Sequence, residues 1–192
     1  RFAPAGQSTQ MIIGADATDD HTILKTAETL YGAYRLRRVY YSAFSPIPFS
    51  AGTLPNQAPP LLREHRLYQA DFLVRGYGFS IQELLPEPGN LALDIDPKLS
   101  WALSNRSLFP VDLNAADSWL IARVPGIGVL NAQRIVALRR QRKIRFNDLL
   151  HLRCQMAKLR NFIQTVDYRP LHADQTSEAL KAKLAERQLP LF

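Results

Sequence analysis

Cysteine is almost absent from this chain of 192 residues, in which Cys154 is the only one. A single thiol excludes an intrachain disulfide framework and a cysteine-ligated metal cluster held by this chain alone. The sequence also lacks an apolar run long enough to cross a bilayer, and it shows no signal peptide. We therefore expect a cytoplasmic protein without a membrane partner.

An initiator methionine is missing as well, because the chain begins at Arg1 and the first methionine is Met11. Residues 2–6 are typical of a loop entered from an upstream segment. We therefore expect a fragment or a processed product of a longer protein. With 46% apolar and 21% charged residues, the chain has the composition of an ordinary globular protein.

Acidic residues are scarce in residues 123–169, where 11 basic residues face only two acidic ones, Asp148 and Asp167. This segment has a net charge of +9, whereas residues 1–100 sum to −1 and the whole chain to +7. A concentrated positive field favours a polyanion such as nucleic acid or an acidic membrane. A solvated basic surface is the alternative, and no strong apolar face accompanies the charge to suggest a membrane.

The N-terminal half alternates between strand and helix patterns. Residues 10–15 form a short apolar run that favours a buried strand, and residues 38–44 are β-branched and aromatic. Between them, apolar residues recur at helical spacing from Ile23 to Tyr31, behind capping residues. Two buried strands joined by a helix form a parallel βαβ unit.

The C-terminal half shows an all-helical pattern from about residue 112 onward. Asn114 is predicted to cap one helix and Asn147 a later one. Between the first two helices lies the sequence Val-Pro-Gly-Ile-Gly, residues 124–128. The boundary between the two halves is expected between residues 86 and 110, where prolines interrupt the chain.

The two glycines of residues 124–128 have a physical use. Gly126 and Gly128 lack a Cβ and can adopt positive φ, so a tight turn can point successive N–H groups outward at the start of the next helix. Such a nest binds a phosphate oxygen without reading sequence, while Ile127 packs inward. The predicted DNA-binding residues are Pro125, Gly126, Ile127, Gly128, Val129, Asn131, Arg134, Arg139 and Arg140.

These residues resemble the helix-hairpin-helix family, in which a Pro-Gly-apolar-Gly turn precedes a helix with a small residue near its start. Residues 124–128 match this pattern, as do Ala132 and the apolar Ile135. Residues 112–115 also resemble competence-type DNA-binding proteins. The family carries a basic or polar residue just after the hairpin, where this chain has Leu130 and Asn131, so we expect a weaker side-chain contact. The resemblance implies DNA-backbone binding, and a hairpin used only for packing between domains is the alternative.

Some glycosylases use the same hairpin, followed by a Gly/Pro-rich segment that bears a catalytic aspartate. Residues 141–148 contain neither glycine nor proline. Asp148 instead has the position of a first-turn helix residue. We therefore reject glycosylase chemistry and predict no catalytic residue in this chain.

The N-terminal half resembles part of a radical S-adenosylmethionine barrel. Residues 7–20 resemble its sixth βα unit, residues 38–48 the next strand and loop, and residues 63–71 the following helix of one subgroup. That subgroup comprises proteins of DNA modification or repair with a C-terminal helix-hairpin-helix and a uracil-DNA-glycosylase-like partner. The resemblance implies the last βα units of a partial TIM-type barrel.

The family holds its 4Fe-4S cluster with three cysteines near the start of the barrel, and this chain has none of them. The resemblance therefore implies that the intact protein is an enzyme that uses the cluster and S-adenosylmethionine, and that this chain alone is inactive. Gly14, Ala15 and Ser42 are the candidate cofactor contacts at the C-terminal face of the barrel, with ordinary packing as the alternative. A non-enzymatic DNA-binding adaptor is the other function to consider.

Residues 188–192, Gln-Leu-Pro-Leu-Phe, resemble the peptide by which bacterial repair proteins dock on the sliding clamp. Short flexible peptides order on binding, and an apolar pair can fill a pocket on the partner. The alternative is a tail that packs on its own protein. The predicted clamp-binding residues are Gln188, Leu189, Leu191 and Phe192.

Four segments and a fold class of α/β plus all-α follow from these patterns. Residues 1–90 are expected to be the last βα units of the barrel, and residues 91–106 a linker with a helix. Residues 107–168 are expected to form the helix-hairpin-helix domain, and residues 169–192 a flexible tail.

Overall fold

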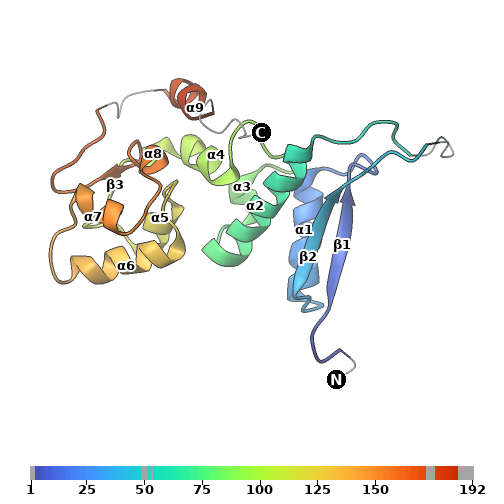
Figure 1. Ribbon diagram of the computed structural model, residues 1–192, viewed down its shortest axis with the longest axis horizontal. Coiled ribbons are helices and arrows are strands. Elements are labelled where there is room, and N and C mark those ends of the chain that lie inside the picture. Colours follow the sequence, from blue (N-terminus) through green and yellow to red (C-terminus); the bar gives the residue numbers. More distant parts are fainter. Residues whose placement is uncertain (1–2, 49–51, 53, 172–175, 186–192) are drawn as a thin grey trace. The chain divides into compact units, whose positions relative to one another are not determined.

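The computed structural model describes residues 3–48, 52, 54–171 and 176–185. The fold is mixed α/β, and the chain divides into two compact units, Arg1–Leu93 and Asp94–Phe192 (Figure 1). Each sheet in the described residues has two strands, so this part of the chain contains no closed barrel. Nor does any described helix combine the length and apolar character needed to cross a membrane.

The first unit is built around a parallel βαβ arrangement, as the sequence predicts. Strands β1 and β2 pair in parallel, from Ser8 opposite Arg38 to Ile13 opposite Ala43. Helix α1 begins after Asp19, whose Oδ1 accepts the Thr22 N–H at 2.8 Å. The elements are β1 (Ser8–Ile13), α1 (Asp20–Gly32), β2 (Arg38–Ala43), α2 (Leu61–Tyr77) and α3 (Ile81–Leu84).

The two edges of the β1–β2 sheet differ. Side chains of α1 and α2 accept the outward N–H groups of β2: Val39 donates to Tyr31 Oη (3.0 Å), Tyr41 to Tyr68 Oη (2.9 Å) and Ala43 to Glu64 Oε2 (2.8 Å). Tyr68 Oη also donates to the Tyr41 carbonyl at 3.0 Å. Among the described residues, β1 pairs only with β2. The sheet is therefore closed to a further strand beside β2 and open beside β1.

The second unit is mainly helical, but its ends are joined by a ladder that the sequence patterns did not predict. Strands β3 and β4 pair in parallel through only two residues each, Val111 opposite Ile163 and Asp112 opposite Gln164. Two residues are too few to produce a recognisable alternation in sequence. The strands are β3 (Val111–Asp112) and β4 (Ile163–Gln164).

The helices of the second unit surround a core of aliphatic and aromatic side chains, among them Ile121, Ile135 and Phe162, each fully buried. Helix α4, predicted within the linker of residues 91–106, belongs to this unit. The helices are α4 (Pro97–Ser104), the 3-10 helix η1 (Arg106–Leu108), α5 (Ser118–Arg123), α6 (Val129–Arg139), α7 (Phe146–His151), α8 (Met156–Leu159) and α9 (Ser177–Ala185).

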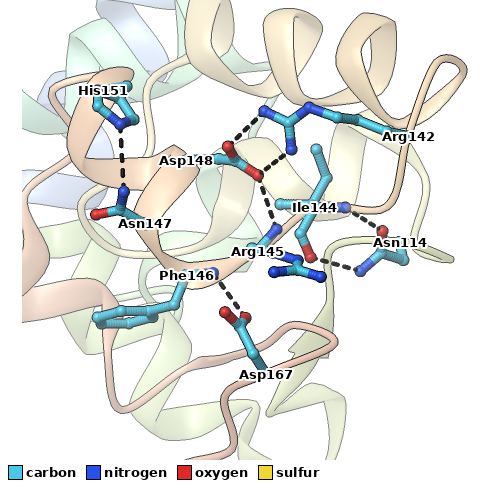
Figure 2. Close-up of polar contacts among 9 residues, drawn as sticks. All are labelled: Asn114, Arg142, Ile144, Arg145, Phe146, Asn147, Asp148, His151 and Asp167. Carbon is cyan, nitrogen blue, oxygen red and sulfur yellow. Dashed lines mark hydrogen bonds and ion pairs between the residues drawn. The ribbon is translucent and has the colours of Figure 1, made fainter.

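The two asparagines predicted as helix caps have other roles, and both predictions are wrong. Helix α5 begins after Asp117, whereas the Asn114 amide donates to the Ile144 carbonyl (3.2 Å) and accepts the Ile144 N–H (2.7 Å) (Figure 2). Asn147 lies inside α7, where its side chain contacts His151. A side-chain amide can satisfy a distant peptide as well as a helix end, and sequence does not distinguish the two.

Candidate nucleic-acid interface

The hairpin, residues 124–128, joins α5 to α6 through a tight turn. The Ile127 N–H donates to the Val124 carbonyl at 3.1 Å, and Gly126 between them has φ +90°. Proline at the second position and a positive-φ glycine at the third are the arrangement of a type II β-turn. Ile127 is 1% exposed and packs inward, as predicted.

Gly128 does not adopt the positive φ that the sequence suggests for both glycines. It has φ −86° and ψ 163°, the extended conformation of the N-cap residue of α6. An N-cap residue takes extended dihedrals, and any L-residue can adopt them. The dihedral angles of Gly128 therefore do not require glycine, and what distinguishes the residue is only that it lacks a Cβ.

Helix α6 begins with a row of N–H groups that the described residues leave without an acceptor. No side chain caps this helix, and its first bond from the hairpin is the Ala132 N–H to the Gly128 carbonyl at 2.9 Å. The N–H groups of Gly128, Val129, Leu130 and Asn131 precede that bond. Leu130 is 69% exposed, and the other three residues are half-buried. Unsatisfied N–H groups at the positive end of a helix attract an anion.

Two hydrogen bonds from other elements hold the hairpin in place, and a third ties the first turn of α6 to Leu152. The Gln155 N–H donates to the Gly126 carbonyl at 3.1 Å, and Lys98 Nζ donates to the Ile127 carbonyl at 2.6 Å. Asn131 Nδ2 donates to the Leu152 carbonyl at 2.9 Å. The Asn131 side chain, predicted to contact DNA, is therefore engaged within the protein, and only its backbone N–H remains for a ligand.

Residues 152–155 form a second turn, between α7 and α8, that the sequence analysis missed. Helix α7 ends with the Cys154 N–H on the Leu149 carbonyl (3.0 Å) and the Arg153 N–H on the Leu150 carbonyl (2.9 Å), the pattern of a Schellman motif. Arg153 has φ +55°, where glycine is the usual residue. Without a glycine, the turn carries no recognisable sequence signal.

The basic residues of this unit divide into an exposed set and a structural set. Arg139, predicted to bind DNA, instead donates through Nη1 to the carbonyls of Leu113 and Ala116. Arg123 is 7% exposed and lies against the rings of Trp101 and Trp119. The exposed cations are Arg134, Arg140, Arg142, Lys143, Arg145, Arg153, Arg160, Arg169 and Lys183.

Asp148 lies in the first turn of α7, as predicted, and closes the loop after α6 (Figure 2). Its two carboxylate oxygens accept from the Arg142 guanidinium at 2.6 and 2.9 Å, and one of them also accepts the Arg145 N–H at 2.8 Å. The hydrogen bond from Arg142 holds the pKa of Asp148 below its usual range. A fixed anion in this loop is a structural group, and it neutralises one of the exposed arginines.

The candidate cofactor residues of the first unit lie at one end of its sheet. Gly14 and Ala15 directly follow β1, and Ser42 pairs opposite Ile12 near the end of β2. Gly14 has φ +80°, and a Cβ there would lie 2.8 Å from the Pro59 ring, so the position requires glycine for packing. The described residues contain no cluster of side chains able to hold a metal ion. Gln188, Leu189, Leu191 and Phe192 lie outside the described residues.

The chemistry that this arrangement offers is anion binding by backbone amides, with exposed cations in the same unit. Comparison of the chain with protein-family models, curated proteins and solved structures finds no match.

Proposed function

We propose that the second unit binds the sugar–phosphate backbone of DNA through the hairpin and the first turn of α6. The observation that carries this proposal is the row of N–H groups from Gly128 to Asn131 without an acceptor in the described protein. A phosphate oxygen is a strong acceptor and carries the charge that a helix N-terminus favours. Such a contact fixes the protein on a strand without reading its bases.

Two features of the site favour a long polyanion over a free phosphate ion. The exposed cations are distributed over α6, the α6–α7 loop, the second turn and the chain after α8, rather than gathered in one segment. Separate cations release separate counterions from a polyelectrolyte, which increases affinity for a chain of phosphates. The hairpin's resemblance to the helix-hairpin-helix family adds DNA as the specific nucleic acid.

Duplex binding should be strongly salt-dependent and indifferent to sequence. Fluorescence anisotropy with two unrelated 20-base-pair duplexes should give equal affinities, and log K should fall linearly with log salt. Replacing Arg140 with alanine should reduce that slope by about 0.9, because one phosphate contact is lost. Lys25→Ala, in α1 of the first unit, should leave the slope unchanged.

Two results would count against the DNA proposal. Affinity that differs strongly between the two duplexes and ignores salt would mean that bases, not phosphates, are recognised. Absence of duplex binding by a folded chain would remove the proposal altogether. Both results are independent of any activity of a longer protein.

For the intact protein, we propose a radical S-adenosylmethionine enzyme of DNA modification or repair, with this chain as its DNA-docking end. The two-stranded parallel sheet, closed beside β2 and open beside β1, is the arrangement expected at the last strand of a larger parallel sheet. The chain supplies no cysteines for the cluster, so no chemical step is assigned to its residues. A sliding clamp and a uracil-DNA-glycosylase-like protein are the proposed partners.

The alternative is a non-enzymatic adaptor that uses the same hairpin. The two functions differ in the metal content of the intact protein purified without oxygen. An enzyme of this class should contain about four iron atoms and as much acid-labile sulfide per chain. An iron-free protein that retains duplex binding would identify the adaptor.

A further inference from the structure

Lys98 reaches the hairpin from outside the two helices that the hairpin joins. It lies in the first turn of α4, and its Nζ is 2.6 Å from the Ile127 carbonyl oxygen. Burial lowers the pKa of Lys98 to about 7, with further lowering from Arg123 and Lys158 and an opposing effect from Asp96. A protonated lysine that is partly buried beside two other cations lowers the stability of the fold, and its hydrogen bond to the hairpin offsets part of this cost.

The direction of the Gly128 N–H follows from this contact. The Ile127–Gly128 peptide is trans, so its carbonyl and its N–H point in opposite directions. With the carbonyl held by Lys98, the Gly128 N–H is turned away from α4. That N–H has no acceptor among the described residues and is the first of the row of N–H groups at the start of α6.

We infer that Lys98 is a positioning residue, which holds the Ile127–Gly128 peptide so that the Gly128 N–H faces the phosphate; the inference rests on the proposed DNA binding. An ammonium on the carbonyl also polarises the peptide, and hydrogen bonds in such a chain strengthen one another. Lys98 itself contacts the side of the peptide opposite the phosphate, so it does not neutralise one.

Helix α4 contacts α8 as well, the helix that directly follows the second turn. Asp96, the N-cap residue of α4, accepts the Leu99 N–H through Oδ1 at 2.9 Å. Its Oδ2 lies 2.8 Å from Lys158 Nζ in α8. The start of α4 is thus tied to α8 by Asp96 and to the hairpin by Lys98. A helix that the sequence places in the linker thus supports the proposed binding site from behind.

The test compares Lys98→Met, Lys98→Arg and the unaltered chain at pH 6, where Lys98 is mainly protonated. Lys98→Met should weaken duplex binding about tenfold, the worth of one charge-assisted hydrogen bond, with an unchanged salt slope. Lys98→Arg retains a cationic donor and should restore most of the affinity. In nitrogen–proton correlation spectra, Lys98→Met should shift the Gly128 amide and abolish its response to DNA.

Each other outcome has a definite meaning. A slope reduced by about 0.9 in Lys98→Met would show that Lys98 touches a phosphate itself and would overturn the positioning role. Unchanged affinity and an unshifted Gly128 amide would overturn it too. If the unaltered chain does not bind DNA, the proposed function fails, whereas binding that ignores Lys98 refutes only this inference. If Lys98→Met does not fold, Lys98→Gln, a neutral donor, takes its place.

Discussion

Replacing Gly128 with aspartate should abolish duplex binding while leaving the protein at least as stable as before. Gly128 has the extended dihedrals of an N-cap residue, so aspartate fits its backbone without strain. The new carboxylate would accept the N–H groups at the start of α6 and complement the helix dipole, which adds about 0.5–1 kcal/mol of stability. It would also occupy the proposed phosphate position with a like charge.

The expected loss of affinity is at least about 100-fold, because like charges in contact cost several kcal/mol and each 1.4 kcal/mol is a factor of ten. Gly128→Asn is the matched control, since it caps the same amides without the charge and should weaken binding less. Anisotropy measures affinity, and urea unfolding measures stability. Retained binding by a stable Gly128→Asp chain would place the DNA contact elsewhere, on the exposed arginines.

The largest loss of stability should come from Gly126→Ala. A Cβ at Gly126 would lie 2.8 Å from the Gln155 carbonyl oxygen, a backbone atom, and the residue has φ +90°. The left-handed conformation costs a side chain about 1–2 kcal/mol, and the contact adds a comparable amount by forcing the hairpin from the second turn. We expect the free energy of unfolding to fall by about 2–4 kcal/mol.

Tryptophan fluorescence during urea unfolding measures this loss selectively, because both tryptophans, Trp101 and Trp119, lie in the second unit. Gly128→Ala, two residues away and free of the φ requirement, should cost only about 0.5 kcal/mol. Equal effects of the two substitutions would mean that the positive φ and the contact with Gln155 do not constrain the hairpin.

Local signals in the sequence were sufficient for the turn and for the βαβ unit. The Pro-Gly pair predicts a tight turn, which the structure forms as type II, and apolar Ile127 predicts its inward packing, because both depend on residues adjacent in the chain. Likewise, the apolar and aromatic runs predict β1 and β2, since a buried strand has a composition of its own. Asp148 was placed correctly in the first turn of α7.

Long-range partners explain what the sequence did not reveal. Nothing adjacent to Arg139 in the sequence indicates a partner, yet its guanidinium donates to the carbonyls of residues 113 and 116, more than twenty positions earlier. Lys98 reaches the hairpin across 29 residues. The second turn uses arginine where glycine is the usual signal. Charge counted along the chain therefore overstates how much of it can face a ligand.

The unequal edges of the β1–β2 sheet determine how copies of the described first unit can associate through their strands. On the β2 side, the N–H groups donate to side chains of Tyr31, Tyr68 and Glu64. In the described residues of this sheet, only β1 has backbone groups that can pair with a further strand. A unit with one unpaired strand edge can pair with one other copy, and after that neither copy has an unpaired edge left. Such association stops at a pair, whereas a sheet with two open sides would elongate into a fibre.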